Sequence, residues 1–338
     1  MKRRIIICLA AFVVSAVVFS GCGKKPAGDG ENGEGQAKVK VLKLAHGLPT
    51  DHPVHKAMEY MADLVAEKSG GKMKVDIYPS EQLGTEKECL ERLQMGALAM
   101  TKTSSSPMET FVKEMKVLGL PYVFRDKDHY WKVLLSDVGK ELLAAGEAKR
   151  LKGLCFYDAG ARSFYTVKKE VNSPADLAGL KIRVQQSPVA MQLVDAMGAS
   201  ATPIAWGELY TSLQQGVVDG AENNPPSLYT SKHYEICKYY TLDEHTRPPD
   251  ILLISTRVWK QLSAAQQKIL QDAVDESVTF QRKLWAEFEK KSMNEIQKAG
   301  VKIIKPDKAP FRKAVEGMLK EYEGTSIGDL VKRIGEVR

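Results

Sequence analysis

The chain has 338 residues, of which 43% are hydrophobic and 27% charged, and its formal net charge at pH 7 is +7. No acidic residue precedes Cys22, so leaving out Lys2, Arg3 and Arg4 lowers the charge to +4, an excess too mild for a nucleic-acid-binding protein. About 300 residues follow residue 37, more than a single hydrophobic core usually holds, so two lobes are expected.

The N-terminal segment is typical of a targeting sequence. Its basic start is followed by an apolar run at 5–18 that is short for a membrane span of about 20 residues. Small residues then lead to Cys22, which resembles the lipobox of a bacterial lipoprotein. We predict a signal peptide at 1–21, acylation of Cys22 and a lipid-anchored protein at the periplasmic or cell surface. The alternative is an uncleaved anchor helix with an incidental cysteine.

A flexible tether is predicted at 22–37, where residues 23–37 contain five glycines with lysine, proline and glutamate. The folded part then opens with a βαβ pattern: a strand at 39–46, a helix at 53–68 and a strand at 73–78. A second helix follows at 85–95. Short apolar strands that alternate with helices predict a largely parallel sheet with ligand sites at the strand ends.

The second half repeats this alternation. Strands are predicted at 151–156 and 163–168, with a crossing between lobes at 158–162, and the later elements are strands at 180–184, 201–204 and 250–255 and helices at 188–197 and 206–215. Ser263 and Gln266 form a capping box that begins a long helix ending at Gly300, which is long enough to span both lobes. We assign 38–158 and 250–288 to lobe I, and 159–249 and 289–338 to lobe II.

The spacing of the cysteines and the absence of known catalytic motifs argue against several classes of protein. Cys89, Cys155 and Cys237 follow neither CxxC nor zinc-finger spacing and are interpreted as small buried hydrophobic residues. The chain contains no Gly-x-Ser-x-Gly, His-Glu-x-x-His, phosphate loop or Gly-x-Gly-x-x-Gly after a strand. We therefore expect no enzyme, metal or cofactor. A secreted hydrolase that uses Ser104–Ser106, and a structural lipoprotein, remain as competing classes.

A series of landmarks resembles one family of receptors. They are Tyr78-Pro79-Ser80-Glu81-Gln82-Leu83-Gly84, Gly160-Ala161-Arg162, Gly179-Leu180-Lys181-Ile182-Arg183-Val184, Trp206-Gly207-Glu208-Leu209-Tyr210, Val218-Asp219-Gly220-Ala221-Glu222-Asn223 and His233-Tyr234-Glu235. Their order and spacing over about 38–305 are similar to those of DctP-type solute receptors of tripartite ATP-independent periplasmic (TRAP) transporters. Residues 219–226 and 243–246 look like those of members that bind sugar acids.

The resemblance implies a fold and a role. The fold is the α/β, two-lobe, periplasmic-binding-protein-like architecture of class II type, with hinge strands and a long helix across both lobes. The role is to capture a carboxylate-bearing solute, such as a hexuronate, and to deliver it to the membrane permease. The alternative within the family is a receptor for a dicarboxylate or another organic acid.

Two arginines are the first candidates for the binding site. Arg183 lies near the carboxyl end of an apolar strand, where open α/β sheets bind ligands, and its planar guanidinium can hold a carboxylate through two hydrogen bonds. The family likeness gives Arg183 this role, against the alternative of a surface ion pair. Arg162 matches the second arginine of the family, which either contacts the carboxylate or bridges the lobes.

The remaining candidates are polar groups suited to hydroxyls. Asn223 matches a ligand-binding asparagine of the family, and an amide can both donate and accept. Glu222 either accepts from a hydroxyl or interacts with a helix N-terminus. Gln186 is a further polar candidate. Glu86 either reaches the cleft or caps its helix, and His52 either faces the cleft or stabilises a loop. The acidic groups opposite two arginines favour a polyhydroxy monocarboxylate over a dicarboxylate.

Overall fold

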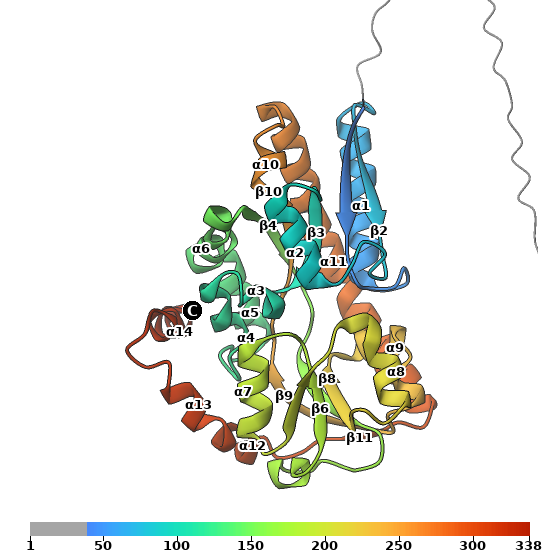
Figure 1. The fold of residues 1–338 in the computed structure, drawn as a ribbon, viewed down its shortest axis with the longest axis vertical. Coiled ribbons are helices and arrows are strands. Elements are labelled where there is room, and N and C mark those ends of the chain that lie inside the picture. Colours follow the sequence, from blue (N-terminus) through green and yellow to red (C-terminus); the bar gives the residue numbers. More distant parts are fainter. Residues whose placement is uncertain (1–38) are drawn as a thin grey trace, which may run out of the picture. The chain divides into compact units, whose positions relative to one another are not determined.

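The protein contains two β-sheets in the computed structural model, which describes residues 39–338 (Figure 1). The predicted signal peptide, the acylation of Cys22 and the tether lie outside the described residues. Each sheet forms the centre of one lobe, in agreement with the predicted two-lobe α/β architecture. We call them the first and second lobe in the order in which the chain enters them.

The first lobe contains a five-stranded sheet in the order β2-β1-β3-β10-β4. Its strands are β1 (Lys40–Ala45), β2 (Met73–Tyr78), β3 (Met100–Ser104), β4 (Leu151–Tyr157) and β10 (Asp250–Ser255). Its helices are α1 (Pro53–Lys68), α2 (Glu86–Met95), α3 (Ser105–Met108), η1 (Lys113–Met115), α4 (Lys116–Gly119), α5 (Lys127–Leu135), α6 (Asp137–Ala145), η2 (Glu147–Lys149) and α10 (Thr256–Trp259). β1 is parallel to β2 and β3, as expected.

The expectation of a largely parallel sheet is wrong for the other half of this lobe. β10 pairs antiparallel with both β3 and β4. The reason is connectivity, because β10 returns from the second lobe and enters the sheet from the opposite side. Asp250 therefore lies opposite Ser104, so the start of one strand and the end of the other meet at the same edge.

The second lobe contains a six-stranded sheet in the order β11-β9-β5-β8-β6-β7. Its strands are β5 (Arg162–Thr166), β6 (Lys181–Val184), β7 (Ser200–Pro203), β8 (Gly220–Asn223), β9 (Tyr239–Thr246) and β11 (Lys302–Ile304). Its helices are η3 (Pro174–Leu177), α7 (Pro188–Ala196), η4 (Trp206–Glu208), α8 (Leu209–Gln214), α9 (Pro225–Thr230) and η5 (His233–Glu235). The single helix predicted at 206–215 is divided into η4 and α8.

The long helix α11 (Ala264–Lys298) joins the lobes, as its capping box and length predicted. It packs against α1 and β4 of the first lobe and against α9 of the second. Gln281 of α11 accepts from the backbone N–H of Asp158 at 2.9 Å and donates to its carbonyl at 2.8 Å. The helix thus supplies both hydrogen bonds of a buried backbone group at the point where the chain leaves β4.

The C-terminal segment consists of α12 (Ala309–Ala314), α13 (Glu316–Lys320) and α14 (Ser326–Glu336). α14 packs against α4 and α6 of the first lobe, a contact that the expected assignment of 289–338 to lobe II did not include. The residue boundaries of the lobes otherwise stay a prediction.

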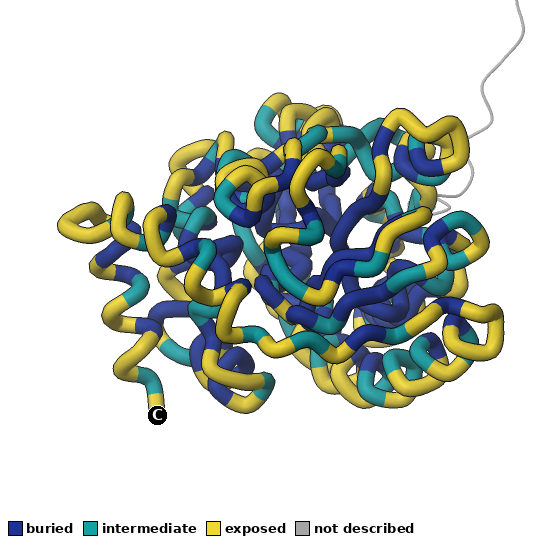
Figure 2. Tube along the Cα trace, turned by 90° about the horizontal axis from the view of Figure 1, so that it is seen from below, coloured by how far each residue is buried: buried dark blue, intermediate teal, exposed yellow. Residues whose placement is uncertain are grey.

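Buried residues are concentrated along the strands and the inner sides of the helices (Figure 2). Cys89, Cys155 and Cys237 are buried and free, which confirms their interpretation as small core residues. Among residues 39–338, no helix has both the length and the apolar character that crossing a membrane requires.

Candidate functional site

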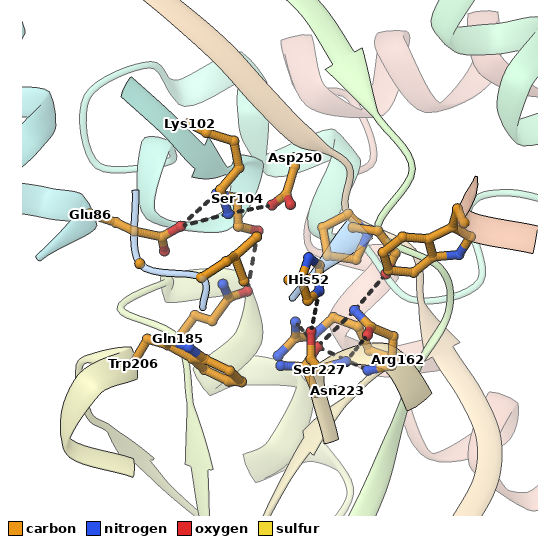
Figure 3. Close-up of a pocket in the computed structure, with 16 residues that line it drawn as sticks. His52, Glu86, Lys102, Ser104, Arg162, Gln185, Trp206, Asn223, Ser227 and Asp250 are labelled. Atoms are coloured by element: carbon orange, nitrogen blue, oxygen red, sulfur yellow. Dashed lines mark hydrogen bonds and ion pairs between the residues drawn. The ribbon is translucent and has the colours of Figure 1, made fainter. Parts of the chain in front are cut away.

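A polar cleft lies between the two lobes. Its walls come from the ends of strands and the loops that follow them, as expected for open α/β sheets. Figure 3 shows these side chains converging from both lobes. The polar lining residues are His52, Glu86, Lys102, Ser104, Arg162, Gln185, Asn223, Asn224, Ser227 and Asp250, together with Trp206 and Trp285.

A lysine between two carboxylates forms the first-lobe wall. Glu86 begins α2, and its Oε1 accepts from the backbone N–H of Ser104 at 3.0 Å. Lys102 of β3 is buried, with Nζ 3.6 Å from Glu86 Oε1 and 3.2 Å from Asp250 Oδ1. Burial raises the pKa of Asp250, although Lys102 opposes this shift. The wall therefore has one cation and two carboxyl groups.

Sequence reasoning missed Lys102 and Asp250 as site residues. The only local signals were a lysine between two threonines shortly before Ser104 and an aspartate at the start of an apolar strand. These two residues lie 148 positions apart, and only the antiparallel pairing of β3 with β10 brings them together.

Arg162 and Asn223 form the opposite wall. β5 begins at Arg162 and β8 ends at Asn223, and the Arg162 Nη1 donates to Asn223 Oδ1 at 2.9 Å. Arg162 also forms a two-point ion pair with Glu222, in which its Nε donates to Glu222 Oε2 and its Nη2 donates to Oε1 at 2.7 Å. Burial opposes ionisation of Glu222, but Arg162 and His245 hold its pKa at about 2. Glu222 lines a small neighbouring cavity rather than the main cleft.

A row of buried charges continues behind Glu222. His245 Nδ1 lies 2.7 Å from Asp243 Oδ2, and its Nε2 lies 3.4 Å from Glu222 Oε2. Both ring nitrogens therefore face carboxylates. Burial alone would lower the pKa of His245, but Asp243 and Glu222 raise it to about 9. Arg162, Glu222, His245 and Asp243 thus form two buried cations paired with two anions.

His52 caps a helix and also borders the cleft. It is the N-cap of α1, where its Nδ1 accepts from the backbone N–H of Val54 at 3.2 Å, and it also lines the cleft. Burial and the charge of Lys102 hold the pKa of His52 well below its usual value. The ring is therefore neutral, with its proton on Nε2, which lies 3.5 Å from Ser227 Oγ.

Arg183 of β6 lies in a second, smaller cavity beside the cleft, and the two cavities share Glu86, Gln185 and Trp206. Its Nε and Nη2 donate to the carbonyl of Ile204 at 2.9 and 2.7 Å, and its guanidinium lies 5.6 Å from the ring centre of Trp206. Its Nη1 is buried and has no hydrogen-bond partner within residues 39–338. A buried cationic donor of this kind needs an acceptor.

Gln185, rather than the predicted Gln186, reaches the main cleft. Its Oε1 accepts from Ser104 Oγ at 3.4 Å, which links the lobes, whereas Gln186 lines the cavity of Arg183. Neighbouring residues after a strand point to different sides, so a one-residue choice decides which side chain enters the site. Within the described residues, no group of three or more His, Cys, Asp or Glu side chains is arranged so that it could hold a metal ion.

Comparisons with known proteins identify the family of the chain. The family model of bacterial extracellular solute-binding protein family 7 (DctP) matches residues 44–325. A TRAP periplasmic solute-binding protein from Bradyrhizobium sp. BTAi1, solved in complex with D-galacturonate, is 43% identical with a TM-score of 0.85, covering 87% of this chain and 99% of that one.

Two further relatives bind different acids. A TRAP solute-binding protein from Roseobacter denitrificans with bound β-D-glucuronate is 32% identical with a TM-score of 0.86, covering 88% of this chain and all of that one. The C4-dicarboxylate-binding periplasmic protein DctP of Rhodobacter capsulatus is 32% identical over 300 residues, which are 88% of this chain and 89% of that protein.

The charge of His245 predicts a pH dependence of stability. Its folded-state pKa of about 9 lies above the usual 6.5, so the imidazolium stabilises the fold fully below about pH 6.5, and this contribution is lost as the pH rises through about 9. We expect the free energy of unfolding, measured by urea denaturation, to fall by roughly 3 kcal/mol across this range.

Two histidine variants isolate this effect. Glu109, whose pKa burial raises to about 8, also titrates in this range, so His245→Gln should remove only the larger part of the slope between pH 6.5 and 9. His233→Gln should keep it, because burial and Arg183 hold the pKa of His233 at about 3 and this ring does not titrate in the range. A wild-type stability that stays flat from pH 6.5 to 9 would show that His245 is not a buried cation.

Proposed function

The chain belongs to family 7 of the bacterial extracellular solute-binding proteins, and from this premise we propose that it captures a hexuronate or similar sugar acid and delivers it to the membrane subunits of a TRAP transporter. The solute is bound between the lobes and released without chemical change. Arg183, Arg162, Asn223, Glu86 and His52 are the proposed binding residues, and Gln185 joins them.

The distribution of charge in the cleft carries this proposal. On the second-lobe side, Arg162 lines the cleft, and Arg183 holds a buried N–H without a partner. On the first-lobe side, Lys102 balances only one of the two carboxyl groups of Glu86 and Asp250. A single carboxylate is attracted to the arginines on the second-lobe side, whereas sugar hydroxyls can donate to the carboxyl groups on the first-lobe side.

The role of Glu222 changes within this proposal. Its carboxylate is already bound by Arg162 and lies beside His245, so a hydroxyl of the solute would have to compete with a buried ion pair. Glu222 instead holds the guanidinium of Arg162 in place. Gln186 lies beside Arg183 and is proposed to contribute to the same carboxylate subsite.

A C4 dicarboxylate is the second candidate, and Lys102 is the observation that favours it. A second carboxylate near this buried ammonium would gain one ion pair. It would also approach Glu86 and Asp250, and like charges in a buried site are costly. The uronate is favoured because its hydroxyls satisfy the same groups without adding charge.

The one histidine–serine pair in the cleft does not support hydrolysis. In a catalytic dyad, the histidine accepts the serine proton. His52 Nδ1 already accepts from Val54, which leaves the proton on Nε2, the nitrogen that faces Ser227. The pair is arranged for donation by histidine, in keeping with a receptor rather than an enzyme.

A comparison of acids tests the ligand class. D-galacturonate and D-glucuronate should raise the melting temperature, because a ligand at one hundred times its Kd stabilises the folded state by about 2.7 kcal/mol. Succinate at the same concentration should have little effect. Tighter binding of succinate than of either uronate in titration calorimetry would reject the uronate in favour of the dicarboxylate.

The variant Arg183→Lys tests the carboxylate subsite. Lysine keeps the charge but cannot bind both the Ile204 carbonyl and a carboxylate, so we expect uronate affinity to fall by roughly 2–4 kcal/mol, tens-fold to about a thousandfold. Arg257→Lys is the matched control, because Arg257 also donates to a carbonyl, that of Met95, but lies outside the cleft. Unchanged affinity of a folded Arg183→Lys protein would remove Arg183 from the site.

We also propose that acylation of Cys22 anchors the receptor to the membrane and that residues 22–37 form the tether. The support is the basic start, the short apolar run and the cysteine at its end. Cys22→Ser should move the protein from the membrane fraction to the soluble fraction, as followed by cell fractionation. Retention in the membrane would favour an uncleaved anchor helix.

A further inference from the structure

The loop between β2 and α2 holds an unusual backbone conformation. Ser80 (φ 53°) and Glu81 (φ 58°) are consecutive non-glycine residues in the left-handed region, which costs free energy for any residue with a Cβ. The loop is held in this shape because Ser80 N–H donates to the Leu48 carbonyl at 3.1 Å and Glu81 N–H to the His46 carbonyl at 3.0 Å. The result is a rigid support for the Glu81 side chain.

The Glu81 side chain reaches from the first lobe to the second. Its Oε2 accepts from the backbone N–H of Gly207 in η4 at 3.1 Å. A Cβ on Gly207 would lie only 2.4 Å from that oxygen. The φ of Gly207 is not positive, so a side chain here would not strain the backbone but would displace the Glu81 carboxylate. η4 begins at Trp206, which lines the solute cleft, whereas Glu81 itself does not line it.

Glu81 also faces the cavity of Arg183. Its Oε1 is buried without a hydrogen-bond partner in the described part of the chain, as is Arg183 Nη1, and both residues line the same space. Burial and Glu86 raise the pKa of Glu81, while Gly207 and Arg183 act against this shift. The contact with Gly207 therefore compensates part of the cost of desolvating this carboxylate.

We propose that Glu81 is a positioning residue that latches the lobes together and holds η4, with Trp206, over the captured solute. The inference rests on the proposed function, because a latch requires a solute to retain. Solute reaches the cleft before the latch forms, so the latch slows dissociation and leaves association unchanged.

Solute-binding kinetics of the full chain test the latch, with D-galacturonate as the probe. Glu81→Ala should speed dissociation about tenfold, the effect of losing one hydrogen bond to a charged acceptor, with association within about twofold of wild type. Glu81→Gln keeps an acceptor oxygen and should recover most of the slow dissociation. Gly207→Ala should speed dissociation like Glu81→Ala, because its Cβ displaces the Glu81 carboxylate. Glu91→Ala, an exposed residue of α2, is the matched control and should match wild type.

The melting temperature without solute separates a latch from a structural role. It should be the same for Glu81→Ala and wild type, because the contact is absent when the lobes are apart. The latch would be overturned if Glu81→Ala left the dissociation rate unchanged or changed only the association rate. It would also be overturned if Glu81→Ala lowered the melting temperature as much without solute as with it. If the wild type binds succinate but not D-galacturonate, the proposed ligand class fails, and the same kinetics measured with succinate decide on the latch.

Discussion

Arg162 carries a buried guanidinium that needs hydrogen-bond acceptors. Much of the arrangement around the cleft depends on the residues that supply them. Arg162 is the first residue of β5, where the chain has just entered the second lobe, and its donors are taken by Glu222 and Asn223 of the neighbouring strand. An isolated charge at this depth would be strongly unfavourable. The ion pair with Glu222 therefore fixes how β5 and β8 present their ends to the cleft, and His245 extends the same charge balance to β9.

The connections between the lobes place this charge system beside the solute. The chain passes from β4 to β5 and returns from β9 to β10, and both passages border the cleft through Ala159 and Pro248. Gln281 of α11 satisfies both backbone groups of Asp158 at the first passage. α11 packs on helices of both lobes, so it is a third connection between them in addition to these two passages.

The cleft combines groups that keep their charge with one group that is kept neutral. Lys102 raises the cost of protonating His52, and the N-cap bond of His52 fixes its tautomer, so its Nε2–H is a fixed donor. From the opposite lobe, Arg183 supplies a further donor, its Nη1–H, which has no hydrogen-bond partner within residues 39–338. Fixed donors on two sides of a polar cavity suit a ligand with acceptors at both ends, and they need no rearrangement of protons when it binds.

Local patterns in the sequence determined much of the fold, because their causes are local. The capping box at Ser263 and Gln266 starts α11, and alternation and helical spacing define β1, α1 and β2. The family landmarks single out Arg183, Arg162 and Asn223 as candidates for the site. Contacts between distant segments were decided only by the tertiary structure. Lys102 meets Asp250 across 148 residues, Glu81 meets Gly207 across 126, and Gln185 rather than Gln186 enters the cleft. No spacing along the chain encodes these pairings, because they depend on strand order, on the direction of β10 and on the closing of one lobe against the other.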